Sequence, residues 1–281
     1  MKRRALGVAT SLVATVVLVG CLSETAKSSG STDQDQLLGH VHGLGTDPDD
    51  GTLYVASHMG VFRRQDDGRL ERVADRWQDT MAFTVVGPGH FIASGHPDLR
   101  EDLPPQLGLI ESTDAAETWR SLSLQGRADF HALDVSSDLI YGYDSANGAL
   151  LKTLNGRRWQ VIDRGPLADI AADPSDSSRL LATTPQGQLL AYDVPPGTRE
   201  SVDGAPPLYL IDWVEGDSVV GVSAAGELFL SRDSGRSWQP LPRVTGEPQA
   251  LDAEPGLWHL ATTHGIYRST DEGRTWENLL A

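Results

Sequence analysis

An eight-residue segment recurs along this chain and constrains its fold more than any other feature. Residues 269–276 (STDEGRTW) and 231–238 (SRDSGRSW) share the pattern S-x-D-x-G-x-S/T-W, and residues 112–119 (STDAAETW) keep all of it except the glycine. Weaker copies begin at residues 64, 152 and 193. The copies start about 40 residues apart, with one longer interval, and this period is typical of a β-propeller in which each repeat forms one four-stranded blade.

The chemistry of this segment, known as the Asp box, suits a tight turn between two strands. Its Asp carboxylate can accept hydrogen bonds from backbone N–H groups of the turn, and its Gly adopts a positive φ angle without steric cost. Its Trp begins the next strand and can fill space between neighbouring sheets. Because none of these roles needs a substrate, we expect Asp114, Asp233 and Asp271 to be structural rather than catalytic.

Six repeats predict an all-β fold, a β-propeller of six four-stranded blades with Asp-box turns. A seventh blade would require an unrecognised repeat in the long interval between residues 64 and 112, and we do not expect one. Short runs rich in β-branched and aromatic residues, separated by Gly, Pro and Asp, support strands throughout. No helical periodicity competes with this pattern after the first 20 residues.

The beginning of the chain has the pattern of a bacterial lipoprotein signal peptide. A basic start, Lys2-Arg3-Arg4, precedes an apolar run over residues 5–19, which is too short for a comfortable membrane span. The run ends in Leu-Val-Gly-Cys at residues 18–21, which matches a lipobox. We therefore expect lipid attachment at Cys21, the only cysteine of the chain, and an extracytoplasmic location in which this lipid anchors the protein to the bacterial membrane.

The remaining domain boundaries follow from composition. Residues 22–36 are rich in Ser, Thr, Asp and Gln and resemble a flexible tether. The expected organisation is a signal peptide over residues 1–20, a lipidated Cys and tether over residues 21–36, and a propeller domain over residues 37–281. Removal of residues 1–20 takes away three basic residues and no acidic one, so the net charge changes from −16 to −19. This charge opposes a nucleic-acid partner and is compatible with cations or neutral ligands.

Tracing the blades places the chemically unusual residues on one face of the ring. The turns between the first and second strands and the Asp-box turns lie on one face. We call the opposite face, which carries the blade-to-blade links and the turns between second and third strands, the top face. His131 of blade 3 matches His42 of blade 1, and Met81 or Ala82 occupies this place in blade 2. Six of the eight histidines are expected at the top face: His40, His42, His58, His96, His131 and His264.

Three interpretations of these histidines remain open. In the first, the imidazoles of blades 1 to 3 bind Zn or Cu, and Met59 or Met81 would favour Cu. In the second, they form a cleft in which His and Arg100 hydrogen-bond a polar ligand such as a glycan. In the third, they only cap strands, and the propeller is a scaffold for a protein partner. The candidate ligand-binding and metal-binding histidines are His40, His42, His58, His96 and His131.

Several carboxylates are also expected at the top face, which adds a glycoside hydrolase to the alternatives. A glycosidase needs two carboxyl groups about 5–9.5 Å apart, and sequence alone supplies the acids without their separations. Asp79 and Asp102 belong to the same region. The candidates for a catalytic pair are Asp98, Glu101, Asp129 and Asp144.

The Asp boxes resemble the bacterial neuraminidase repeat, which sialidases, sortilin-type domains and several glycoside hydrolase propellers share. Residues 40–44 (HVHGL), 53–58 (LYVASH) and 91–98 (FIASGHPD) are similar to a group of bacterial lipoproteins described as glycosylhydrolase-like. This resemblance covers nearly all of the mature chain and implies carbohydrate chemistry. A sialidase would show a Phe-Arg-Ile-Pro motif and an arginine triad, whereas residues 62–65 read Phe-Arg-Arg-Gln. The sialidase motifs are therefore not matched.

Overall fold

A computed structural model of the chain describes residues 37–194 and 197–280. The described residues belong to one compact unit of the chain. The expected signal peptide, the lipid site at Cys21 and the tether lie outside the described residues. Within the described ranges, no helix is long and apolar enough to cross a membrane.

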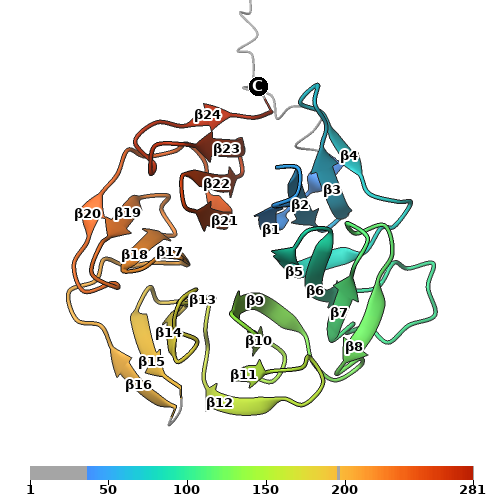
Figure 1. Cartoon of the computed structure of the whole chain (residues 1–281), viewed down its shortest axis with the longest axis horizontal. Coiled ribbons are helices and arrows are strands. Elements are labelled where there is room, and N and C mark those ends of the chain that lie inside the picture. The colour runs from blue at the N-terminus through green and yellow to red at the C-terminus, as the bar shows by residue number, and fades with distance from the viewer. Residues whose placement is uncertain (1–36, 195–196, 281) are drawn as a thin grey trace, which may run out of the picture. The chain divides into compact units, whose positions relative to one another are not determined.

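The described residues form six four-stranded antiparallel sheets arranged as the blades of a propeller (Figure 1). Each blade consists of four consecutive strands, which pair in the order in which they occur in the chain. The prediction of an all-β propeller with six blades, rather than seven, is therefore confirmed.

The first strand of each blade lines the centre of the ring, and the fourth lies at its outside (Figure 1). The first strands are β1 (Val41–Thr46), β5 (Asp79–Gly87), β9 (Phe130–Ser136), β13 (Asp169–Ala172), β17 (Leu210–Glu215) and β21 (Pro248–Glu254). The second strands are β2 (Leu53–Ser57), β6 (His90–His96), β10 (Leu139–Asp144), β14 (Arg179–Thr183), β18 (Ser218–Val222) and β22 (Leu257–Thr262). The third strands are β3 (Gly60–Arg64), β7 (Leu109–Ser112), β11 (Ala149–Thr153), β15 (Leu189–Asp193), β19 (Leu228–Ser231) and β23 (Gly265–Ser269). The fourth strands are β4 (Leu70–Arg72), β8 (Arg120–Ser123), β12 (Gln160–Arg164), β16 (Thr198–Ser201), β20 (Gln239–Pro240) and β24 (Glu277–Asn278).

The Asp box of blade 6 shows why this segment forms a turn. Oδ1 of Asp271 accepts a hydrogen bond from the Thr275 N–H at 2.8 Å, and Oδ2 accepts one from the Thr275 hydroxyl at 2.7 Å. The hydroxyl of Ser269 accepts the N–H of Gly273 at 2.9 Å. Gly273 has a φ of +76°, and a Cβ there would lie 2.9 Å from the buried ring of Trp258. The hydrogen bonds from Thr275 lower the pKa of Asp271 to about 2, so its carboxylate is a fixed structural acceptor.

The boxes of blades 2 and 5 repeat this hydrogen bonding through Asp114 and Asp233. The blade 2 box lacks the glycine, and Ala116 takes its place with a φ of +69°. An L-residue adopts this left-handed conformation at some energetic cost. The hydrogen bonds of the box are therefore strong enough to impose the turn even without the glycine.

The ring closes by packing of blade 6 against blade 1. Each blade is built from four consecutive strands, so no strand from one end of the chain completes the blade at the other end. Leu38 and Val41 of blade 1 belong to the same buried apolar cluster as Ala250 and Leu279 of blade 6. The side chain of Gln249 adds a polar contact, since its Oε1 accepts the Val41 N–H at 3.2 Å. Blades 6 and 1 are thus joined mainly by removal of apolar surface from water.

Three aspartates of the channel link neighbouring blades, a role that the sequence analysis did not predict. Each carboxylate accepts a hydrogen bond from a backbone N–H of the next inner strand. Burial raises the pKa of Asp134 to about 6 and that of Asp169 to about 7, and it also raises the pKa of Asp212 well above its usual value. The linking bonds run from Ala172 to Asp134 (2.6 Å), from Ile211 to Asp169 (2.9 Å) and from Ala253 to Asp212 (2.7 Å).

Candidate metal and ligand site at the top of the channel

Four of the six inner strands contain an irregularity close to their first residue. In β1, β5, β9 and β21 the pairing with the second strand skips one residue, so that this residue has no partner of its own. Such β-bulges redirect a side chain and are frequent beside functional sites. The skipped residues all line the central channel, a cavity of about 690 Å³, and they are His42, Met81, His131 and Gln249.

The bulges occur in adjacent blades, in the order 6, 1, 2 and 3 around the ring. β13 and β17 have regular pairing at the same end. The predicted equivalence of His42, Met81 and His131 is thus seen as one repeated backbone feature. It makes one side of the channel mouth chemically different from the other.

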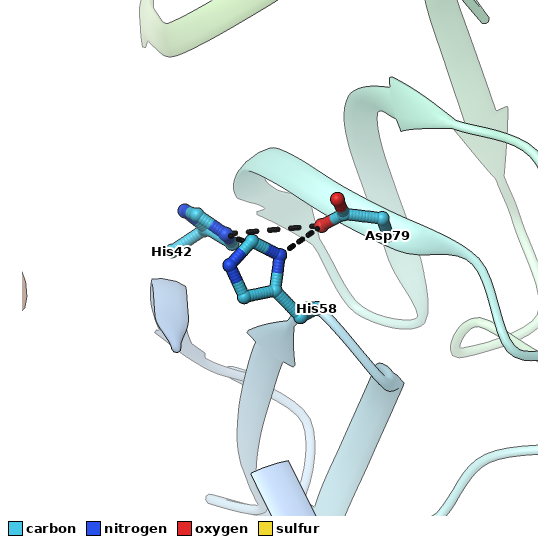
Figure 2. A group of neighbouring side chains, drawn as sticks. All are labelled: His42, His58 and Asp79. Atoms are coloured by element: carbon cyan, nitrogen blue, oxygen red, sulfur yellow. Dashed lines mark hydrogen bonds and ion pairs between the residues drawn. The ribbon is translucent and has the colours of Figure 1, made fainter. Parts of the chain in front are cut away.

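Three side chains from blades 1 and 2 converge at this mouth (Figure 2). Nε2 of His42 lies 3.3 Å from Nδ1 of His58, and Nδ1 of His58 lies 2.9 Å from Oδ1 of Asp79. The third side of the triangle, from Nε2 of His42 to Oδ1 of Asp79, measures 3.7 Å. Ligands at zinc distances of 2.0–2.1 Å lie about 3.3 Å apart when the coordination is tetrahedral. The triangle therefore has the dimensions of three corners of a metal site.

Local backbone structure brings these three residues together. His58 directly follows β2, where the hydroxyl of Ser57 accepts the N–H of Met59 and donates to the carbonyl of Gly60, which fixes a tight turn. The His58 N–H also donates to the carbonyl oxygen of His40 at 3.1 Å. This hydrogen bond joins the start of β1 to the end of β2 and so holds His42 and His58 next to each other.

Asp79 reaches the triangle because of a glycine in the neighbouring strand. Asp79 begins β5 and pairs with His96 at the end of β6. Gly95 has a φ of +145°, and a Cβ on it would lie only 2.0 Å from the carbonyl oxygen of Asp79. Only glycine allows this close approach, which sets the position of the Asp79 carboxylate.

The electrostatics of the triangle favour a neutral His42. Burial is the largest cause, and together with nearby imidazoles it lowers the pKa of His42 to about 3. The pKa of His40 is lowered as well, first by burial and then by His58. A carboxylate only accepts hydrogen bonds, so Nδ1 of His58 donates its proton to Asp79. One proton therefore occupies the place where a cation would bind all three atoms.

The other predicted histidines surround the triangle without joining it. The ring of His40 lies 4.7 Å from that of His42 and 5.8 Å from that of His58, measured between ring centres. His96 donates from Nδ1 to the carbonyl oxygen of Pro105 at 2.7 Å. Of the five candidate histidines, His42 and His58 thus form the triangle with Asp79, and His40 lies beside it. The other two, His96 and His131, contact other protein groups. The charges of His96 and His131 act on His42, so they belong to the same electrostatic environment.

The predicted carboxylates of the enlarged loop after β6 form structural contacts. Asp98 accepts the Trp77 N–H at 2.9 Å and is paired with Arg100, which lowers its pKa. Arg100 also pairs with Asp75 at 2.9 Å. Glu101 pairs with Arg76 at 3.1 Å. Asp98 and Asp75 thus bind the guanidinium of Arg100, and the expected contact of Arg100 with a ligand stays a prediction.

The remaining candidate carboxylates and methionines also differ in whether they contact the protein interior or the channel mouth. Both carboxylate oxygens of Asp144 accept hydrogen bonds in its turn, from the backbone N–H groups of Asp129 and Asn147 and from the Asn147 amide. Asp129 instead contacts His131, with Oδ2 3.0 Å from Nε2. Met59 packs against the apolar cluster between blades 1 and 6, whereas Met81 lines the channel.

Comparison with known proteins supports the fold and leaves the activity open. No protein-family model matches the chain, and no curated protein matches it in sequence. A gluconolactonase from Xanthomonas campestris aligns with a TM-score of 0.65 and 13% identity over 84% of this chain and 86% of that one. YCF48, in a complex with a D1 peptide, aligns with a TM-score of 0.55 and 16% identity over 85% and 80% of the two chains.

A GH74 enzyme from Niastella koreensis aligns with a TM-score of 0.59 and 17% identity. The alignment covers 85% of this chain but only 37% of the enzyme, so the chain spans little more than a third of that protein. At these identities the likeness shows a shared β-propeller fold, and a propeller hosts many unrelated activities.

Proposed function

We propose that the protein is an extracytoplasmic, lipid-anchored β-propeller that binds one transition-metal ion through His42, His58 and Asp79. The observation that carries this proposal is the convergence of the three side chains, whose ligand atoms all lie within 4.8 Å of one another. The residues come from two blades, and a positive-φ glycine positions one of them. The arrangement is therefore more specific than a chance group of surface residues.

The chemistry of the ligands selects the class of metal. Two imidazoles and one carboxylate suit Zn or Cu, whereas Mg and Ca prefer sites built from oxygen ligands. The dimensions of the triangle suit tetrahedral zinc. Met81 lies in the same channel lining as His42, and a thioether would favour copper. Zn and Cu are thus the two metals to compare.

Three protein ligands leave a coordination position for an exogenous molecule, as in catalytic rather than structural zinc sites. The cavity of about 690 Å³ beside the triangle is large enough for a small polar molecule. We infer that such a molecule, a short glycan included, binds over the mouth and contacts the metal. In this proposal the lipid on Cys21 holds the binding face outside the cytoplasm.

A glycoside hydrolase is less well supported by the geometry. The mechanism requires a pair of carboxyl groups that flank the scissile bond. Asp98, Glu101 and Asp144 are each bound to neighbouring protein groups. The GH74 neighbour shares the propeller fold, but its activity is a property of that enzyme.

Titration of the full chain with Zn²⁺ and with Cu²⁺, each followed by calorimetry, tests the proposal. One ion should bind per protein, and His42→Ala and His58→Ala should each abolish tight binding. His264→Ala is the matched control, since His264 lies exposed in the turn after β22 of blade 6. Binding that survives both substitutions would remove the basis of the proposed function.

A further inference from the structure

A second pair of side chains at the channel mouth has the geometry of a general base and its orienting carboxylate. Nε2 of His131 lies 3.0 Å from Oδ2 of Asp129. The side chain of Asp129 is 13% exposed, whereas that of His131 is 36% exposed. The carboxylate is thus buried behind an imidazole that faces solvent, as in dyads that orient a catalytic histidine.

The contact fixes the tautomer of His131. Burial alone would raise the pKa of Asp129, but the hydrogen bond from His131 and the charges of His131 and His96 outweigh burial and lower it. An ionised carboxylate only accepts hydrogen bonds, so Nε2 carries the proton and Nδ1 carries a lone pair. Nδ1 has no hydrogen-bond partner among the residues that the structure describes. A lone pair without a protein partner is what proton abstraction requires.

His131 of the dyad and His42 of the metal triangle line the same channel. His131 is the bulged residue of β9 and lines the channel, as His42 does in β1. The charge of His131 also contributes to the low pKa of His42. A molecule bound in the mouth can therefore lie close to both groups.

The charges around the mouth restrict the substrate. Three arginines of blade 1 and the loops beside it already have protein partners: Arg72 donates to the Met59 carbonyl and stacks on Trp77, Arg76 pairs with Glu101, and Arg100 pairs with Asp98. These protein partners compete with a phosphate or carboxylate group of a substrate for the three guanidinium groups, and the net charge of −16 also opposes an anionic substrate. A neutral substrate whose polar group meets the metal fits this environment best.

We propose that Asp129 and His131 act beside the metal triangle to hydrolyse neutral carboxylic esters, lactones included. This inference rests on the proposed metal site and adds an activity to it. A neutral ester needs no cationic subsite, and its hydrolysis requires a base and an electrophile in one pocket. His131 would be the catalytic residue, and Asp129 would be a positioning residue that acts through it.

The step balances with water as the only co-reactant. Nδ1 of His131 takes a proton from a water molecule, and the water oxygen forms a bond to the carbonyl carbon of the ester. The electron pair of the C=O bond moves to the carbonyl oxygen, where the charge of a metal ion held by His42, His58 and Asp79 would stabilise it. When this pair returns, the bond from the carbonyl carbon to the alcohol oxygen breaks, and that oxygen takes the proton from His131. With one water molecule, an open-chain ester becomes one carboxylic acid and one alcohol, and a lactone becomes one hydroxy acid.

The test uses the full chain loaded with one equivalent of Zn²⁺ and two neutral probes, δ-valerolactone and p-nitrophenyl acetate. His131→Ala should lower kcat/KM by roughly 10²–10⁴-fold, the usual contribution of a general base, while calorimetry shows unchanged zinc affinity. Asp129→Asn should lower kcat and move the acid side of the rate–pH profile to lower pH, because the amide no longer stabilises the imidazolium. His264→Ala should retain full activity.

The outcomes distinguish this inference from the proposed function. If zinc binds tightly but the protein hydrolyses neither probe, or does so equally well after His131→Ala, the dyad is not catalytic and the metal site stands. If zinc does not bind, both proposals fail. An Asp129→Asn protein that folds, as judged by its circular dichroism spectrum, and keeps an unchanged rate–pH profile would overturn the positioning role.

Discussion

Nδ1 of His58 lies 2.9 Å from Oδ1 of Asp79, although His58 follows the second strand of blade 1 and Asp79 begins the first strand of blade 2. This contact ties two blades together at the channel mouth. It also leaves Nε2 of His42 within 3.7 Å of the same carboxylate oxygen. A structural link between blades and three ligand atoms of a candidate metal site therefore coincide.

Replacing the Asp79 carboxylate should show whether this residue is a metal ligand as well as a link between blades. Asp79→Asn keeps the shape of the side chain but removes its charge, so we expect zinc affinity to fall by roughly 100-fold, since even the loss of an outer-shell partner typically lowers affinity 10–100-fold. The measurement is calorimetric titration with Zn²⁺. Asp102→Asn is the matched control, because this exposed acid lies in the neighbouring loop. Equal affinities of the two variants would show that Asp79 is not a ligand.

Gly95 should be essential for the position of Asp79. A Cβ at residue 95 would lie 2.0 Å from the Asp79 carbonyl oxygen, so Gly95→Ala must displace the start of β5. We expect a loss of stability of about 3 kcal/mol or more and weaker metal binding. Gly51→Ala provides the comparison, since Gly51 also has a positive φ but a Cβ added there would meet nothing within 4 Å. That control should cost only about 1 kcal/mol in denaturant unfolding, with unchanged metal affinity.

The channel aspartates should make stability depend on pH. Burial raises the pKa of Asp169 to about 7, so the folded protein binds this proton more tightly than the unfolded chain does. The stability from this effect is complete below the unfolded pKa near 3.8 and is lost as pH rises through about 7. Asp169→Asn cannot ionise, and its side-chain oxygen can still accept the Ile211 N–H.

We therefore expect Asp169→Asn to raise the Tm relative to the unsubstituted protein at pH 8 and to leave it nearly unchanged at pH 4. Thermal unfolding at the two pH values is the measurement. A Tm difference that is the same at both would mean that Asp169 does not titrate with a raised pKa.

The Asp box should contribute to stability without affecting the mouth. Asp271→Ala removes the acceptor of hydrogen bonds from the Thr275 N–H and hydroxyl and from the Ser269 hydroxyl. We expect a loss of about 2–3 kcal/mol in the free energy of unfolding, together with unchanged zinc affinity. A change in zinc affinity without a change in stability would reverse our assignment of this residue as structural.

Sequence was sufficient for the fold because the fold repeats. The Asp box combines an acceptor, a positive-φ residue and an aromatic side chain in one short segment, so even the copy with Ala116 in place of glycine is recognisable and forms the turn. The strand order then places His42, His58 and His131 toward the same end of the ring. These conclusions need only local patterns and connectivity.

The pairing of individual side chains could not be predicted, because it depends on bulges and on contacts between blades. The bulged residues are each followed by a small residue, namely Gly43, Ala82, Ala132 and Ala250. The small residues can be read from the sequence, but only the strand register shows that each of them follows a bulged residue. Gln249 was missed for this reason, and the inter-blade bonds of Asp134 and Asp169 were missed because they join segments about 40 residues apart.

The most direct test of the metal site is a crystal structure of the zinc-loaded full chain, with anomalous scattering recorded at the zinc edge. We predict one strong peak at the channel mouth, with Nε2 of His42, a ring nitrogen of His58 and Oδ1 of Asp79 each about 2.0–2.2 Å away. A peak bound by other residues, or an empty triangle in a crystal whose protein binds zinc elsewhere, would contradict the account.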